Sequence, residues 1–277
     1  MPTRETLSRR SGTFLATNSA AVPPVRWSMR FLLVWAVLLV AWEVLVRSGV
    51  WTGLFTPAPS AIGAALAAMI AEGTLPTHVG YTFVRILTGL LVGATAGVTL
   101  GLAMGVSARL RRLVDPLVAA VHPIPRLAFF PLLIVVLGVG ETSKLAAVSI
   151  GAFFPMLLNT VAGVHSMNPV HLELARNFGA TRWQMFQRVL VPGSLPLMLT
   201  GLRLSSNVAF HGTIGVEMVG SQTGIGSLLW LSWQTFRIDH MYASLVVIAT
   251  IGIGLAVCIR WVTVRAAPWL AERPADG

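Results

Sequence analysis

A few polar side chains interrupt long apolar stretches of this sequence, and they are the residues whose types and spacing can do chemistry. His122 and Arg126 lie four positions apart around Pro123 and Pro125. Facing a watery path, these two cationic groups would favour an anion. Packed inside the protein, His122 would instead satisfy carbonyls that the prolines free, and Arg126 would pack against a neighbour. The sequence supports the two interpretations equally.

Three further polar residues, Asn159, Asn207 and His211, also lie within apolar stretches. Such side chains either line a path or hydrogen-bond between helices, and the second use is the commoner one. Glu43 stands four positions before Arg47, a spacing that predicts a structural ion pair rather than a transport role.

Several catalytic and nucleotide-binding motifs are absent. The sequence contains no G-x-x-x-x-G-K-[ST] phosphate loop, no H-E-x-x-H and no G-x-S-x-G. Its single cysteine, Cys258, excludes an intrachain disulfide and a cysteine-based metal cluster. We therefore expect a chain that is not an enzyme, holds no cofactor or metal of its own, and draws energy from elsewhere.

The composition is that of an integral membrane protein. Hydrophobic residues make up 55% of the chain and charged residues only 11%, with a mean hydropathy of +0.76. The net charge of +10 does not indicate nucleic-acid binding, because the basic residues do not gather with aromatic residues on a soluble domain.

Six stretches carry the roughly 20 mostly apolar residues that a spanning helix needs. They are 29–48, 82–106, 113–137, 143–165, 194–219 and 241–263. We thus predict an all-α polytopic membrane protein with about six transmembrane helices. Pro123, Pro125 and Pro131 must break or kink the third stretch, and freed backbone is tolerated at membrane depth only against protein or water. This stretch is expected to line a path.

The regions around the spans complete the expected organisation. Residues 1–28 are predicted to form a disordered cytoplasmic tail, 29–265 a transmembrane domain and 266–277 a second cytoplasmic tail. Residues 57–75 predict a short helix at the outer surface. Residues 220–240, with two tryptophans, predict an outer interfacial loop.

Most of the 20 lysines and arginines fall on one side of this arrangement, in the N-terminal tail, the 107–112 turn, the segment 166–193 and the C-terminal end. The positive-inside rule then predicts that both termini and the 166–193 segment are cytoplasmic. The opposite loops and their margins hold Arg47, Arg85, Lys144 and Arg237.

Glycine recurs at every fourth position of the second span, at Gly89, Gly93, Gly97, Gly101 and Gly105. Such a stripe lets another helix approach closely. Tight packing is the simpler interpretation, and a seam along which helices rock is compatible with it.

The segment 168–192 has the sequence of two short helices joined at a glycine. Asn168 is a good N-cap, Pro169 suits the first helical position, and Gly179 is the residue expected just past a helix end. The first helix is therefore predicted at about 169 to 178.

The second helix of this segment has equally clear boundaries. Thr181 is its predicted N-cap, Gln184 completes a capping box, and Pro192 is expected to stop the helix after Val191. Neither helix is apolar enough to span a bilayer. We expect this insert, residues 166–193, to dock a soluble partner.

The same residues resemble a known signature. Glu173-Leu174-Ala175, three residues, Gly179, nine residues and Val189–Pro192 match the spacing "E-A-A, three, G, nine, I-x-L-P" of permease subunits of ABC importers. Leu174 replaces the usual alanine, and valines replace the Ile and Leu.

Further segments look like the nitrate, sulfonate, taurine and bicarbonate branch of these permeases: 55–60, 122–132, 138–144, 151–160, 201–203, 216–218 and 224–226. His211 departs from that branch, where an aromatic residue is commoner.

The resemblance implies a type I ABC importer permease fold in the cytoplasmic (inner) membrane of a bacterium. It implies a homodimer of permeases, two cytoplasmic subunits that bind ATP and Mg, and an external solute-binding protein. The residues implied to couple the permease to the ATPase are Glu173, Leu174, Ala175, Gly179, Thr181 and Pro192.

The implied substrate is a small anionic solute of the sulfonate, taurine or nitrate type, moved by alternating access. An uncharged or cationic vitamin precursor is the alternative. An ion-coupled secondary transporter is a weaker one, because its expected inverted repeat is not visible.

Overall fold

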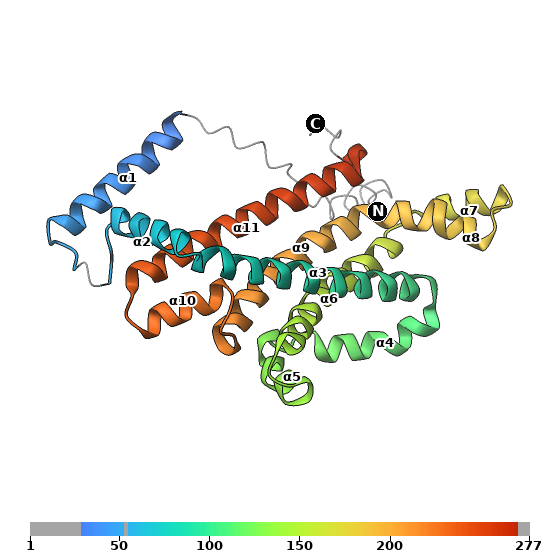
Figure 1. The fold of residues 1–277 in the computed structure, drawn as a ribbon. Helices are drawn as coiled ribbons and strands as arrows, with labels where there is room; N and C mark the ends of the chain where they lie inside the picture. The colour runs from blue at the N-terminus through green and yellow to red at the C-terminus, as the bar shows by residue number, and fades with distance from the viewer. Residues whose placement is uncertain (1–28, 53–54, 271–277) are drawn as a thin grey trace, which may run out of the picture. The chain divides into compact units, whose positions relative to one another are not determined.

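The computed structural model describes residues 29–52 and 55–270, and the regular elements in these ranges are all helical (Figure 1). The predicted tail 1–28 and residues 271–277 lie outside the described residues. Contacts divide the chain into two units with the boundary between Leu39 and Val40, which we call unit 1–39 and unit 40–277. The α-helices are α1 (Met29–Arg47), α2 (Pro59–Ala71), α3 (Thr74–Val106), α4 (Ala108–Val121), α5 (Phe130–Leu137), α6 (Glu141–His165), α7 (Pro169–Asn177), α8 (Arg182–Met185), α9 (Val191–Gly220), α10 (Ile225–Gln234) and α11 (Ile238–Ala266). Short turns of other helix types are η1 (Arg126–Phe129), η2 (Phe186–Leu190) and η3 (Pro268–Leu270).

Four helices among the described residues are long and apolar enough to cross a membrane: α1, α3, α6 and α11. Helix α4 and the η1–α5 segment would form a fifth span, but they meet at an angle of 93°. The predicted break in the third span is thus confirmed, and it falls where Pro123 and Pro125 lack backbone donors. Helix α9, with 30 residues, covers the predicted span 194–219 but falls outside this apolar group, since it carries several polar side chains.

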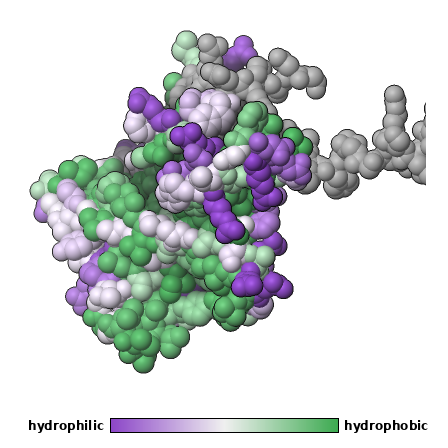
Figure 2. Space-filling model, turned by 90° about the vertical axis from the view of Figure 1, so that its right-hand side faces the viewer, coloured by the Kyte–Doolittle hydropathy of each residue, from purple (hydrophilic) through white to green (hydrophobic). Residues whose placement is uncertain are grey.

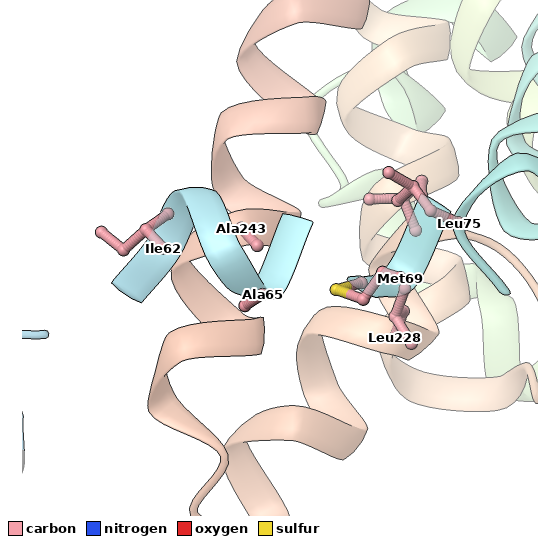
Figure 3. Packing of buried hydrophobic residues seen from close by; sticks show 7 residues of the cluster. Ile62, Ala65, Met69, Leu75, Leu228 and Ala243 are labelled. Carbon is pink, nitrogen blue, oxygen red and sulfur yellow. The ribbon is translucent and has the colours of Figure 1, made fainter. Parts of the chain in front are cut away.

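An apolar cluster packs α2 against α10, α11 and the start of α3. Figure 3 shows Met69 of α2 facing Leu228 of α10, and Ala65 beside Ala243 of α11. Pro59 at the start of α2 suits the first turn of a helix, where its missing N–H has no partner to lose. The short helix predicted within 57–75 is therefore confirmed.

The loop predicted over 220–240 is mostly wrong, because helix α10 occupies its centre. Ile225, Leu228 and Ser232 are buried at helical spacing, so one face of this segment packs into the apolar cluster. The sequence interpretation gave weight to the glycines and overlooked this periodicity. Trp230 and Trp233, the predicted anchors, are exposed on α10.

The five glycines of the predicted stripe all face α6. A Cβ placed on Gly93 would lie 2.3 Å from the carbonyl oxygen of Ser149, and one on Gly97 would lie 2.8 Å from that of Phe153. Because these neighbours are backbone atoms, they cannot rotate out of the way. Helices α3 and α6 are therefore packed backbone to backbone, which confirms tight packing; movement along the seam stays a prediction.

Four charged side chains, which we call the ion cluster, join α3 to the ends of α6 and α9 that lie away from the insert. Arg85 of α3 donates to Glu217 of α9 at 2.8 Å and to Glu141 of α6 at 2.7 Å. Lys144 donates to Glu141 at 2.9 Å. Glu217, which is completely buried, also accepts from the backbone N–H of Gly226 at 2.9 Å. The cluster thus fixes three helices and the start of α10 to one another.

The ion cluster corrects one prediction from the sequence. The sequence places Arg85 at the margin of an outer loop, yet in the structure it lies well inside α3 and is only 2% exposed. Its burial is possible because Glu141 and Glu217, far away in sequence, neutralise it.

The predicted ion pair between Glu43 and Arg47 is confirmed at 2.6 Å. The same carboxylate accepts from the backbone N–H and the hydroxyl of Ser60, at 3.0 and 2.7 Å. Ser60 lies in the first turn of α2, where backbone N–H groups lack helical partners. Glu43 therefore caps α2, which gives a structural reason for an acidic residue in an apolar helix.

Candidate functional site

The insert between α6 and α9 consists of α7, α8 and η2, and both of its helix starts are capped as predicted. The side-chain oxygen of Asn168 accepts from the N–H of Val170 at 3.0 Å, and Pro169 opens α7. Thr181 accepts from the N–H of Gln184 at 3.2 Å, and the Gln184 side chain accepts from the N–H of Thr181 at 2.9 Å. These bonds satisfy donors that a helix start leaves unpaired.

The end of α7 closes in a two-bond glycine motif. The N–H of Ala180 donates to the carbonyl of Ala175 at 3.0 Å, and the N–H of Gly179 donates to that of Arg176 at 2.9 Å. Gly179 has a φ of +74°, a conformation that costs a residue with a side chain. The predicted first helix and its glycine joint are confirmed, and the joint has a defined shape.

Pro192 does not stop the second helix, contrary to the prediction. Instead α8 passes through η2, a π-type turn, directly into α9, and Pro192 lies in the first turn of α9. The N–H of Val191 donates to the carbonyl of Phe186, five residues earlier. The wider turn makes room for the proline ring, which would clash with the carbonyl four residues before it in a regular α-helix.

The insert lies at the end of unit 40–277 that is remote from α10 (Figure 1). None of the residues of α7, α8 and η2 is buried. Figure 2 looks onto this end and shows hydrophilic and hydrophobic patches side by side. The exposed charges on the insert are three arginines, Arg176, Arg182 and Arg188, and one acid, Glu173. Its surface is thus basic with apolar patches.

Of the residues predicted to couple the chain to a partner, Ala175 is half-buried and the others are exposed: Glu173, Leu174, Gly179, Thr181 and Pro192. Leu174, Ala175 and Pro192 line a groove of about 690 Å³ at the insert. The groove is also lined by Ser166, Met167, Asn168, His171, Phe178, Arg188, Val189, Gly193 and Trp269. The structure therefore gathers three of the six predicted residues in one concave surface.

Two exposed aromatic residues of the insert were missed by the sequence interpretation. Phe178 is 83% exposed, and Trp183 is 63% exposed with its ring stacked on Phe186 at 5.8 Å. Large exposed aromatic side chains on a polar segment indicate a binding surface. Both residues lie close to Gly179, one on each side of it, in an otherwise basic stretch. That position could have identified them as candidate binding residues from the sequence.

His122 and Arg126 lie on the two sides of the bend between α4 and α5. The His122 ring packs edge-on against Phe154 of α6, with centroids 5.8 Å apart. Arg126 lies near Gly151 of α6, and its Nε is buried with no hydrogen-bond partner among the described residues. Each side chain thus has a packing contact, while one donor of Arg126 is left unpaired.

Asn159, Asn207 and His211 form no hydrogen bond between helices within the described part of the chain. Asn159 donates to the carbonyl of Pro155 in its own helix at 2.8 Å, and its Cβ packs against Gly201. The His211 ring bonds to the carbonyl of Asn207, also in its own helix, at 2.7 Å. A bond between α6 and α9 comes instead from Ser205, whose hydroxyl donates to the carbonyl of Ala152 at 2.7 Å.

One face of α9 is exposed along much of its length. The exposed residues Thr200, Arg203, Leu204, Asn207 and His211 follow helical spacing and so share this face. The opposite face, with Ser205, Ala209 and Thr213 among others, is buried. Helix α9 therefore presents a mainly polar stripe that no other element of the described chain covers.

Comparisons with known proteins show which sequences this chain resembles. Residues 89–272 match the family model described as "Binding-protein-dependent transport system inner membrane component". The taurine transport system permease protein TauC of Escherichia coli (strain K12) is 31% identical over 86% of this chain and 88% of its own length. A Bacillus subtilis (strain 168) protein that carries the name of an aliphatic sulfonates transport permease, SsuC, is 32% identical over 87% of this chain and 90% of its own.

Similarity extends to a relative with a different named solute and to a solved structure. The riboflavin transport system permease protein RibX of Chloroflexus aurantiacus is 33% identical over 80% of this chain and 82% of its own length. A chain of the MetNI methionine ABC transporter, solved in inward-facing conformations, superimposes with a TM-score of 0.55 over 67% of this chain and 90% of that one. At 21% identity this second match concerns the fold alone.

Proposed function

The chain belongs to the family of binding-protein-dependent transport system inner membrane components, and from that membership we propose that it forms the membrane path of an ATP-driven importer, with its 168–192 insert as the coupling element. The chain is a permease component without an ATPase domain, and separate ATPase subunits bind the ATP. A solute-binding protein is the other partner that this family implies.

The continuity between the insert and α9 carries the proposal. Helix α8 enters α9 through the π-type turn η2 with no intervening loop, so a force on α8 acts directly on a 30-residue helix. Two capped helix starts and the glycine motif at Gly179 keep the insert itself stiff. A stiff element of this kind can transmit a displacement instead of absorbing it.

The surface of the insert supports a soluble partner. Phe178 and Trp183 expose apolar area that a monomer has no reason to leave in water. Three arginines against one acid make the surround basic. The complementary ATPase surface should therefore present an apolar pocket flanked by carboxylates.

In the proposed cycle, ATP binding brings two ATPase subunits together, and the insert of each permease moves with them. Helix α9 follows, and α6 and α3 follow α9 because they are packed against it and tied to it by the ion cluster. A second copy of this chain would cover the exposed polar stripe of α9 and complete a path that opens alternately to either side. The assembly would be a homodimer of permeases in the bacterial inner membrane, with both termini and both inserts cytoplasmic.

Variants of the insert test the coupling role. Gly179→Pro or Glu173→Lys should abolish transport and ATPase stimulation in vesicles that contain the ATPase subunit, while the protein remains in the membrane. Glu72→Lys, an equal charge reversal at an exposed residue outside the insert, is the control and should keep ATPase stimulation. Normal transport by either insert variant would contradict the proposed role.

The substrate that we propose is a small anionic solute of the taurine or sulfonate type. Relatives whose names specify taurine or aliphatic sulfonates support it, and so does the unpaired buried donor of Arg126, which suits an anion. Nitrate has no such support among the relatives named above. The riboflavin permease relative favours a vitamin-like solute as the second candidate.

Uptake in reconstituted vesicles separates these candidates. With the binding protein present, taurine and a short alkanesulfonate should be taken up and riboflavin should not. Uptake of riboflavin alone would favour the second candidate.

Cysteine labelling tests which side chains face the path. Single cysteines at His122, Arg126, Asn159, Asn207 and His211, in a Cys258→Ser background, should react with a small hydrophilic thiol reagent, and substrate with binding protein should change the rate. Positions that never react do not line the path.

A further inference from the structure

Trp269 brings the C-terminal end of the described chain to the insert. It follows α11 by three residues, yet it lines the same groove as Leu174, Phe178 and Arg188. Ala267, just before it, is 1% exposed, and its N–H bonds back to the last turns of α11 at 3.0 Å. The chain is therefore anchored at Ala267, while the Trp269 side chain beyond it stands 52% exposed.

The groove is thus lined both by an exposed indole and by exposed apolar side chains of the insert. Trp269, Phe178 and Leu174 are each more than half exposed. Grouped apolar area of this kind marks a binding surface, and tryptophan is enriched among the residues that dominate binding free energy. Arg188, in the same groove, adds a positive charge at its edge.

We propose that Trp269 is a second anchor of the ATPase docking surface, so that one ATPase subunit contacts the insert and the C-terminal end of α11 together. This inference rests on the proposed function of the insert. The occupant follows from continuity: most of the groove is formed by the insert that the ATPase would bind, and Trp269 lines the same groove. The excess of arginine over acid on the insert also fits a partner that brings carboxylates.

A second anchor changes how movement reaches the membrane. Through α8 and η2 the ATPase acts on α9, and through Trp269 it acts on α11. Helices α9 and α11 are packed against each other, so both would be displaced in one step. The contact at α11 would also tighten assembly of the complex.

Binding of the purified ATPase subunit to the full-length permease in nanodiscs tests the inference. Trp269→Ala should weaken binding by about tenfold or more, because a tryptophan that anchors an interface carries a large share of the binding free energy. Trp269→Phe should retain most of the affinity. The matched control is Trp261→Ala, because Trp261 is similarly exposed on α11, contacts Arg265 at 4.8 Å and does not line the groove.

Equal affinity of Trp269→Ala and wild type would overturn the inference, as would an equal loss in Trp261→Ala. The proposed function is judged separately by Gly179→Pro. If Gly179→Pro loses ATPase stimulation while Trp269→Ala binds normally, the second anchor is wrong and the coupling role stands. If both variants behave as wild type, the coupling role is wrong as well.

A labelling experiment covers the case in which Trp269→Ala does not fold. In a Cys258→Ser background that keeps Trp269, a cysteine at the neighbouring exposed Pro268 should react with a thiol reagent in the free permease and be protected when the ATPase subunit is added. The same reaction rate with and without the ATPase subunit would overturn the inference.

Discussion

At one end of α6 and α9 the ion cluster buries paired charges, whereas at the other end the insert has no buried residue in α7, α8 or η2 and keeps its shape through its own caps. Arg85 and Glu217 hold each other across 132 positions of sequence. In the insert, the bonds that define α7 and α8 join residues at most five positions apart. One end depends on the tertiary fold, and the other depends on local sequence.

This difference indicates a division of labour. A defect in the ion cluster leaves an uncompensated charge inside the helix bundle and should unfold the protein. A defect in the insert changes only a short exposed element and should leave the bundle folded but poorly coupled to its ATPase. Stability and coupling should therefore separate in variants of the two ends.

The largest expected effect is that of Arg85→Met. This change leaves Glu217 buried beside Thr82 without its cation, at a cost of about 3–5 kcal/mol. We expect little folded protein in the membrane. The chain that can be solubilised in detergent should have a lower melting temperature than wild type. Adding Glu217→Leu should recover part of the loss, because the buried charge is then gone. If Arg85→Met is as stable as wild type, the ion cluster does not hold the helices together.

Next in size is the effect of a methyl group in the seam between α3 and α6. Gly97→Ala places a Cβ about 2.8 Å from the carbonyl oxygen of Phe153 and should destabilise the protein by about 1–3 kcal/mol. The control is Gly80→Ala in the same helix, where no atom lies within 4 Å of the new Cβ. Alanine favours helix by about 0.5–1 kcal/mol over glycine, so the control should be neutral or stabilising. Equal melting temperatures for the two variants would contradict tight packing.

A smaller effect is expected from Thr181→Ala in the insert. Loss of the cap costs about 0.5–2 kcal/mol, but the cost falls on α8 alone. The thermal stability of the whole chain should stay within error of wild type, while ATPase stimulation falls. A drop in stability comparable to that of Gly97→Ala would show that the two ends are not independent.

The smallest effect is predicted for the exposed ion pair of α4. Arg111 and Asp115 lie 3.1 Å apart with both side chains more than 40% exposed. Pairs of this kind contribute less than about 1 kcal/mol, so Asp115→Ala, which leaves the bond between Arg111 and His165 in place, should leave thermal stability nearly unchanged at any salt concentration. A large loss would mean that exposed charges matter as much as the ion cluster does.

Elements whose signals are local could be predicted well. The caps at Asn168 and Thr181, the turn at Gly179 and the break between α4 and α5 all follow from residues within a few positions of one another. The prediction for Pro192 is wrong because proline either ends a helix or opens one. In this protein the π-type turn η2 before Pro192 lets the helix continue, so that Pro192 lies in the first turn of α9.

Contacts between distant segments could not be predicted in the same way. Glu217 lacked a partner in the sequence because Arg85 is 132 positions away, and helix α10 was hidden by its glycines. The sequence of α9 does not show which face of the helix other helices cover. That depends on how α9 packs against α6.

The sequence by itself determined that the chain is a helical membrane protein with a stiff, basic, capped insert, because hydropathy, capping and turn formation act over one or two helical turns. The tertiary structure decided which charges are buried together, how closely α3 and α6 pack, and that Trp269 lies beside the insert. These features depend on helices that meet only in the folded chain. The free energy that stabilises them comes from contacts between residues distant in sequence, which no local pattern reveals.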